Sequence, residues 1–278
     1  IRPVHGRPLA WGRRYAAVIL RSVKPEEGEG YKRGPALSAL MEGNAEGVRA
    51  EVNALYKQAA SDLEEFGIRT EMILSMSVFT TQDDFLLLEA ARDHLLKTLP
   101  EPDWIGEPRA LGHYGNLNVV DGFYPSPIYQ HGTLPYPVEG GHFVFDEAGH
   151  PALVREFEQR VSFSIPTSEM PAAGYPLVLY AHGTGGSYLS YVNDGTAASL
   201  AARGIAMMGI DQIHHGPRLP PEAGQEPELF VYNILNPHAF RYNALQAALD
   251  VVQQARFAVR AEIDGELIGR PDERIVFD

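Results

Sequence analysis

The residues with the clearest chemical meaning in this chain form a glycine-rich loop at 182–187, which reads His-Gly-Thr-Gly-Gly-Ser. The loop follows an apolar run at 176–181, which is typical of a buried strand. In acyl transfer the carbonyl oxygen gains negative charge, and backbone N–H groups placed near it in advance lower the barrier. Glycines let a backbone approach a ligand closely. We therefore expect the N–H groups of Thr184 and Gly185 to form an oxyanion hole, with His182 orienting the loop by hydrogen bonds.

The sequence offers no clear nucleophile for that loop. The Gly-x-Ser-x-Gly signature, which presents a serine on a sharp strand-to-helix turn, does not occur in the 278 residues. Ser187 has a glycine two residues before it but none two residues after it. Ser187 is thus an alternative nucleophile, or a loop hydroxyl near the acyl group. A simple tight turn that needs glycines is the other interpretation of the loop.

A second polar cluster, at 209–218, holds Asp211, His214 and His215 directly after another apolar run. The carboxyl end of a strand is where α/β sheets place their sites. We expect His214 and His215, together with Tyr188, to contact the substrate. For Asp211 and His215 themselves we favour the interpretation that they hydrogen-bond to each other and hold the loop. Adjacent histidines point in different directions and no third ligand is near in sequence, so we expect no metal and no other cofactor.

The segment that follows this cluster allows two interpretations. Residues 217–235 are rich in Pro and Glu and also carry apolar residues, which fits either a lid-like excursion or an ordinary surface loop. Asn236 and Pro237 then fit the N-cap and first position of a long helix. In its first turns, Arg241 and Asn243 are expected to tie the helix to a neighbouring loop.

Composition excludes several classes of function. The net charge is −13, and binding of DNA or RNA needs clustered Lys and Arg, so we expect no nucleic-acid partner. The chain has no cysteine, which excludes disulfides and thiolate catalysis. No apolar stretch approaches the roughly 18 residues of a membrane-spanning helix.

Hydrophobic periodicity divides the chain into three regions. Residues 1–100 are interpreted as an N-terminal β-rich domain with inserted helices. Its expected strands lie at 15–20 and 72–79, and its expected helices lie at 45–66 and 83–98. Residues 101–141 hold many Pro, Gly and aromatic residues without sustained periodicity, which indicates short strands and a long ordered linker. In residues 142–278, two apolar runs flank a predicted helix at 194–203, a pattern typical of a parallel α/β sheet.

The order of these pieces resembles a bacterial α/β-hydrolase family of large secreted or surface-anchored lipases and esterases, in which an Ig-like β-rich region precedes the catalytic domain. The matching residues in the first region are Leu9, Gly12, 15–20 and 78–82. The later matches are 181–186, 209–211, 215–216 and 236–257.

The resemblance implies an α/β fold, with a partial α/β-hydrolase parallel sheet in 142–278 preceded by a smaller, β-rich α+β, Ig-like domain. It implies a serine esterase or lipase of the bacterial envelope, secreted or on the cell surface, that acts on an ester or lipid-like small molecule. In that family the next element carries the nucleophilic serine, followed by the acid and the histidine. The resemblance therefore places all three beyond residue 278, in a C-terminal remainder of the same protein that could form a second chain.

Two other functions are compatible with the sequence. One is a non-catalytic binding or adhesion module with a degenerate hydrolase domain. The other is a subtilisin-like protease that uses His182, although no earlier strand carries a convincing Asp-x-Gly.

Overall fold

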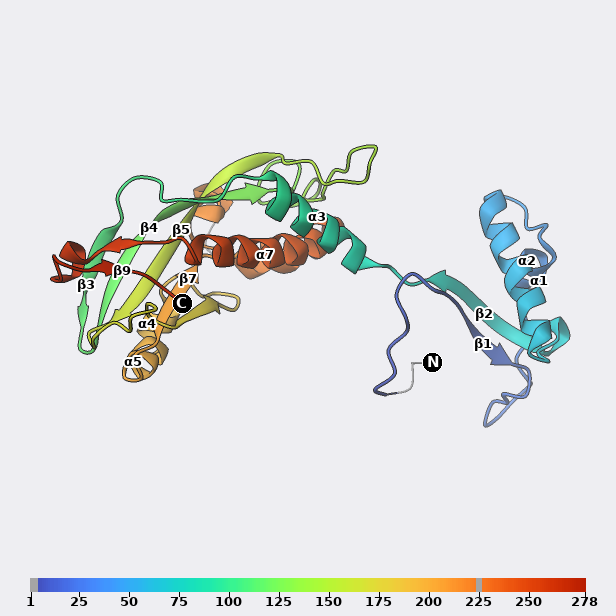
Figure 1. The fold of residues 1–278 in the computed structure, drawn as a ribbon. Coiled ribbons are helices and arrows are strands. Elements are labelled where there is room, and N and C mark those ends of the chain that lie inside the picture. Colours follow the sequence, from blue (N-terminus) through green and yellow to red (C-terminus); the bar gives the residue numbers. More distant parts are fainter. Residues whose placement is uncertain (1–4, 224–226) are drawn as a thin grey trace. The chain divides into compact units, whose positions relative to one another are not determined.

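The computed structural model describes residues 5–223 and 227–278 and divides the chain into two compact units, Ile1–Leu86 and Leu87–Asp278 (Figure 1). Each unit has a hydrophobic core of its own. Within the described ranges, no helix combines the length and the apolar character that crossing a membrane requires.

The N-terminal unit is built on a two-stranded antiparallel sheet. Its strands are β1 (Arg14–Leu20) and β2 (Ile73–Thr80), and its helices are α1 (Pro35–Glu42) and α2 (Ala50–Glu65). Alternate residues of the strands, such as Val18 and its partner Met76, pack against the helices. The strands and the longer helix were predicted, whereas α1 was not. The expectation of an Ig-like domain is wrong, because a single strand pair covered by helices replaces two stacked sheets.

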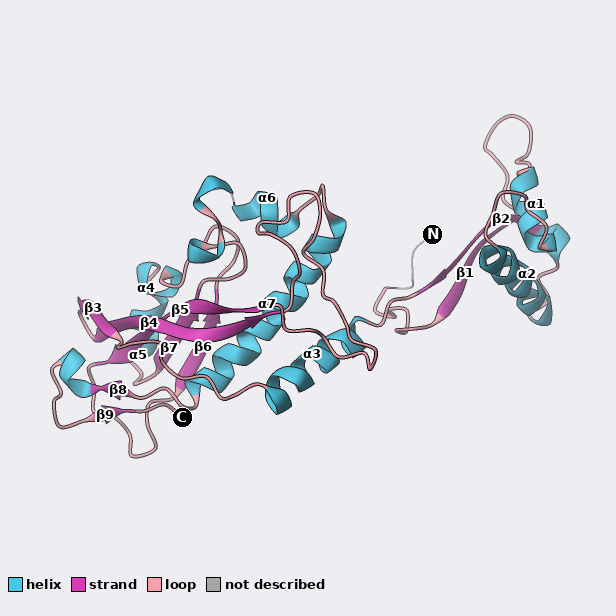
Figure 2. Cartoon of the chain, turned by 90° about the horizontal axis from the view of Figure 1, so that it is seen from above, coloured by secondary structure: helices cyan, strands magenta, loops and turns pink. Residues whose placement is uncertain are grey.

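The C-terminal unit contains a five-stranded sheet in the order β3-β4-β5-β7-β6 (Figure 2). The strands are β3 (Arg109–Tyr114), β4 (Leu117–Ile128), β5 (Arg155–Pro166), β6 (Leu177–Ala181) and β7 (Ala206–Ile210). A short strand pair, β8 (Ile263–Asp264) and β9 (Arg274–Ile275), lies near the end of the chain.

The sheet is mixed, so the predicted α/β-hydrolase parallel sheet is wrong. Only β6 and β7 run parallel, while β3–β4, β4–β5 and β5–β7 are antiparallel pairs. The two apolar runs joined by a helix do form a parallel pair, as their pattern indicated. The pattern did not reveal that β7 has the long antiparallel β5 as its other neighbour, or that the short strands expected in 101–141 are β3 and the longer β4 of the same sheet.

Helices cover both faces of this sheet. The helices are α3 (Asp84–Thr98), α4 (Ser190–Asn193), α5 (Thr196–Ala201), α6 (Pro227–Tyr232) and α7 (Pro237–Ala258). Met208 of β7 belongs to the core cluster that includes Phe257 of α7, whereas its neighbour Met207 packs with Ala197 of α5. Because successive side chains of a strand alternate between faces, α7 and the α4–α5 pair lie on opposite faces. α3 packs on α7 through Leu95 and Leu249.

The parallel pair positions the candidate site. β6 ends at Ala181 and β7 ends at Ile210, and these two residues are direct partners in the ladder. The glycine-rich loop and the 211–218 segment therefore leave the same edge of the sheet side by side.

Candidate functional site

The glycine-rich loop forms a tight turn. The Gly186 N–H donates to the Gly183 carbonyl oxygen at 3.0 Å. Gly185 has a φ of 79°, and the φ of Thr184 is not positive. These features define a type II turn, which favours glycine at its third residue. A Cβ on Gly186 would lie 2.8 Å from His182 Cβ, so this glycine is required for close packing on the histidine.

His182 holds the turn from within the loop. Its Nδ1 donates to the Gly183 carbonyl oxygen at 2.8 Å, and its Nε2 accepts from the Gln212 N–H at 2.9 Å. The ring is therefore neutral, with its proton on Nδ1. Burial lowers the pKa of His182, and the nearby His215 lowers it further. These two hydrogen bonds are the kind expected of a histidine that orients the loop.

His215 supports the turn in the same way from the neighbouring segment. Its Nδ1 donates to the Ile213 carbonyl oxygen at 2.8 Å, and its Nε2 accepts from the Gly185 N–H at 2.9 Å. The His182 and His215 rings meet edge to face, with centroids 4.7 Å apart. Both nitrogens of both rings are committed to the backbone, so neither ring has a nitrogen free to act as a base.

The available hydrogen-bond donors of the turn are the N–H groups of Gly183 and Thr184. Neither has an acceptor among the described residues, and both residues are exposed. Thr184 thus has the free N–H that the sequence predicted. The Gly185 N–H was expected as the second donor, but His215 accepts it, and the Gly183 N–H is the one left open.

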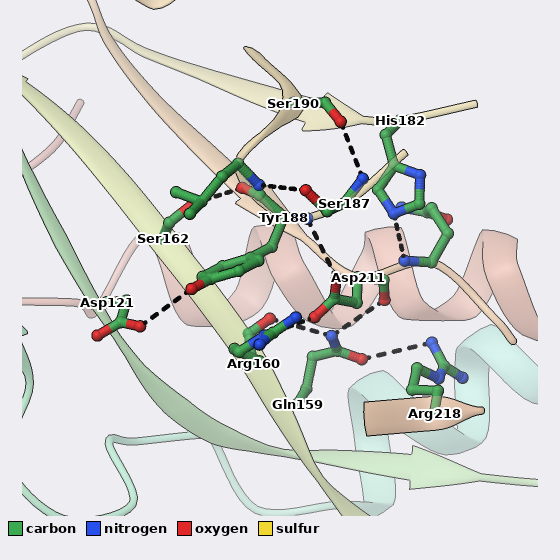
Figure 3. A network of polar contacts seen from close by, with 12 residues as sticks. Asp121, Gln159, Arg160, Ser162, His182, Ser187, Tyr188, Ser190, Asp211 and Arg218 are labelled. Carbon is green, nitrogen blue, oxygen red and sulfur yellow. Dashed lines mark hydrogen bonds and ion pairs between the residues drawn. The ribbon is translucent and has the colours of Figure 1, made fainter. Parts of the chain in front are cut away.

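A buried polar network lies beside the turn (Figure 3). Asp211 is fully buried, and its carboxylate accepts from Arg160 Nε at 2.7 Å and from the Tyr188 N–H at 3.2 Å. The Arg160 guanidinium lies over the Tyr188 ring, 3.9 Å from its centroid. The Tyr188 hydroxyl donates to Asp121 Oδ2 at 3.3 Å. Asp211 therefore fixes the segment after the turn, and it makes no hydrogen bond with His215 within the described ranges.

The network ends in an ion pair at the sheet. Arg109 of β3 contacts the buried Asp121 of β4 through two hydrogen bonds, of 2.6 and 2.9 Å. The hydrogen bond with Asp121 raises the pKa of Arg109, and burial raises the pKa of the Tyr188 hydroxyl. Tyr188 is thus a neutral structural link between β4 and the loop.

Two further glycines let these segments approach each other. A Cβ on Gly209 of β7 would lie 2.6 Å from the Tyr191 ring and 2.7 Å from the Tyr188 carbonyl oxygen. A Cβ on Gly216, whose φ is 51°, would lie 2.7 Å from the Asp211 carboxylate. Strand β7 and the 211–218 segment can therefore pack this closely only because glycine occupies positions 209 and 216.

Ser187 does not have the surroundings of a nucleophile. Its Oγ accepts from the Leu189 N–H at 3.3 Å, and its own N–H donates to Ser190 Oγ at 2.9 Å. In the described parts of the chain, no histidine is hydrogen-bonded to a serine or threonine hydroxyl. Ser187 instead shapes the turn that leads into α4.

The three side chains that were expected to contact substrate are buried. Tyr188 and His215 are 9% and 5% exposed, and His214 is fully buried. His214 has a φ of 57° and lies with its Nε2 3.2 Å from Asn243 Oδ1. Burial lowers the pKa of His214 to about 4. These residues support the loop from beneath and are not presented to solvent. Over residues 5–223 and 227–278, no group of three or more His, Asp or Glu side chains could hold a metal ion.

Sequence reasoning missed two contributors to the site. Tyr232 of α6 lies with its hydroxyl 3.3 Å from Thr184 Oγ1. Arg160 lies in the middle of β5, where nothing in its local sequence distinguishes it from a solvated strand residue.

Asn243 was expected to tie α7 to a loop, and it does so by donating to the carbonyl oxygens of Phe230 and Val231. Of the proposed lid-like segment 217–235, residues 224–226 lie outside the described residues.

Comparison with family models, with curated proteins and with solved structures finds no match to this chain.

Proposed function

We propose that the glycine-rich loop is the oxyanion-binding part of a serine esterase or lipase. The observation that carries this proposal is the pair of exposed, unpaired N–H groups at Gly183 and Thr184, in a turn whose other donors are already bonded. A substrate carbonyl oxygen that becomes an oxyanion gains most from donors that are fixed before the reaction begins. The two histidines and the type II turn supply that rigidity.

In this proposal His182 and His215 are positioning residues. Their Nε2 atoms accept backbone N–H groups, so protonation of either ring would remove an acceptor that the turn needs. The attacking serine and its base are supplied by residues other than those described. The serine oxygen bonds to the carbonyl carbon, the base takes its proton, and the alcohol leaves to give an acyl-enzyme that water then hydrolyses.

One observation favours a second, non-catalytic function. No described histidine has a serine or threonine hydroxyl within hydrogen-bond distance, so the same turn could bind a carboxylate or carbonyl group without cleaving an ester. Under this alternative the protein binds acyl ligands and releases them unchanged.

Ester hydrolysis distinguishes the two functions. We expect the full gene product to hydrolyse p-nitrophenyl esters, and the Ser187→Ala variant to hydrolyse them at the wild-type rate because Ser187 has no base. Residues 1–278 expressed alone should not hydrolyse them. Hydrolysis by residues 1–278 that Ser187→Ala abolishes would instead identify Ser187 as the nucleophile. No hydrolysis by any of these proteins would favour the binding function.

A further inference from the structure

A group of exposed apolar side chains lies next to the glycine-rich loop. Leu229, Ile234 and Leu235 are 59%, 86% and 80% exposed, and Tyr232 and Phe240 are about half exposed, with rings 6.2 Å apart. Single exposed apolar residues are common on soluble proteins, whereas a contiguous group marks a binding surface.

Buried asparagines fix the backbone that carries these side chains. Asn233 Nδ2 donates to the Tyr136 carbonyl oxygen at 2.8 Å, and Asn236 Nδ2 donates to the same oxygen at 3.1 Å and to the Gly140 carbonyl oxygen at 3.2 Å. Both asparagines are at most 4% exposed. Ile234 and Leu235 lie between these two anchors, so their exposure follows from a fixed backbone.

A third asparagine connects this segment to the site. Asn243 of α7 donates to the carbonyl oxygens of Phe230 and Val231 at 2.8 and 3.1 Å. Its Oδ1 lies 3.2 Å from His214 Nε2 and 2.8 Å from Gln130 Nε2, which are its donors. Asn243 therefore links the end of α6 to His214. His214 directly precedes His215, which supports the glycine-rich loop.

Four of these side chains line a cavity of about 570 Å³: Leu229, Tyr232, Ile234 and Leu235. Pro137 forms one wall and side chains of the 229–235 segment form the others, and no charged side chain is among those that line it in the described residues. Tyr232 belongs to this lining, and its hydroxyl lies 3.3 Å from Thr184 Oγ1. Tyr232 thus connects the lining of the cavity to Thr184, whose N–H is one of the two free donors of the turn.

We propose that this cavity binds the aliphatic acyl chain of the ester substrate, an inference that rests on the proposed function of the turn. The lack of charge in the lining selects an uncharged chain, and the size is within the range of small-molecule sites. Tyr232 lies at the junction, so the chain occupies the cavity while the carbonyl oxygen meets the Thr184 N–H. The substrate class is therefore esters with an extended acyl chain, in preference to acetyl esters.

Binding of free carboxylates tests the cavity without requiring hydrolysis. Hexanoate, octanoate and decanoate are titrated into residues 1–278 by calorimetry, with the carboxylate standing in for the oxyanion. We expect the affinity to rise about fourfold for each added methylene, as full burial of that group implies. In the Leu235→Ser and Ile234→Ser variants the chain-length dependence should weaken. Val259→Ser, at an equally exposed apolar residue at the other end of α7, is the matched control and should keep it.

A second variant separates this inference from the proposed function. Thr184→Pro removes the turn N–H and should lower the affinity for all three carboxylates by the same factor, leaving the chain-length dependence intact. A chain-length dependence that survives in Leu235→Ser and Ile234→Ser, or no dependence in the wild type, would overturn the cavity assignment even if the esterase function holds. Self-association that these two variants abolish, without carboxylate binding, would assign the surface to a second copy of the chain and would also overturn it. If the affinity depends on chain length but Thr184→Pro does not change it, the cavity assignment stands and the Thr184 N–H is not the oxyanion donor.

Discussion

The two histidines that flank the turn act as hydrogen-bond acceptors for the backbone, and this role requires them to be neutral. His182 accepts from Gln212 and His215 accepts from Gly185, each with the ring proton on Nδ1. A glycine-rich turn has few side-chain contacts of its own, so these two acceptors replace the packing that larger residues would provide. Both rings are buried, so neither is presented to solvent.

The lowered pKa of His214 predicts a specific pH dependence of the free energy of unfolding. The pKa of His214 falls from 6.5 to about 4 on folding, so the unfolded chain takes up this proton first as the pH is lowered. The contribution of this group is complete above pH 6.5, and about 2–3 kcal/mol of the free energy of unfolding is lost by pH 4.5. His214→Asn, which tolerates the positive φ, should flatten this part of the pH profile.

Urea unfolding at pH 7 and pH 4.5 measures that effect. His113→Asn, at an exposed position on β3, is the control and should retain the wild-type pH dependence. If His214→Asn and the wild type lose the same free energy of unfolding over this range, then the buried His214 is not the titrating group.

Strand β7 can approach Tyr188 and Tyr191, at the start of α4, because Gly209 has no side chain. Gly209→Ala would place a Cβ 2.6 Å from the Tyr191 ring and 2.7 Å from a backbone oxygen, so β7 or the start of α4 has to move. We expect a loss of about 1–3 kcal/mol in the free energy of unfolding, measured by urea denaturation.

Gly183→Ala is the matched control for that variant, because a Cβ there meets no atom within 4 Å and the φ of Gly183 is not positive. Its free energy of unfolding should stay within about 0.5 kcal/mol of the wild-type value. Equal losses in the two variants would show that the close approach at Gly209 does not limit the packing.

The sequence predicted individual elements better than their pairing. α2, α3, α7, β1, β2 and the β6–β7 pair follow from periodicity and from the Asn236 cap, which the structure confirms. β4 was not expected as a long strand because Pro125 and Pro127 interrupt its pattern. Both prolines lie beyond Asp121, where the pairing with β3 ends, so their missing N–H groups cost no ladder hydrogen bond on that side.

The site was predictable in part for a related reason. The turn and its free Thr184 N–H depend on local sequence, so the glycines revealed them. The capture of the Gly185 N–H by His215, and the contact of Tyr232 with Thr184, depend on the pairing of β6 with β7 and on the position of α6. Such contacts between distant segments leave no periodic pattern in the sequence.

The two units have separate cores, and every residue assigned to the site lies in the unit Leu87–Asp278. The mixed sheet supplies a rigid edge on which the turn and the 211–218 segment meet. The proposed binding of the reacting group therefore falls on this edge of the C-terminal unit.

The proposed role of the Thr184 N–H in stabilising the oxyanion is tested by ester hydrolysis in two Thr184 variants. Thr184 is the second residue of a type II turn, a position that favours proline, so Thr184→Pro removes the N–H and keeps the turn. We predict that Thr184→Pro lowers kcat for p-nitrophenyl octanoate by about 10²–10³, whereas Thr184→Ala, which keeps the N–H, retains most of the wild-type rate. Equal rates in the two variants would show that the Thr184 N–H does not stabilise the oxyanion, and no hydrolysis of any ester by the wild type would rule out the esterase function.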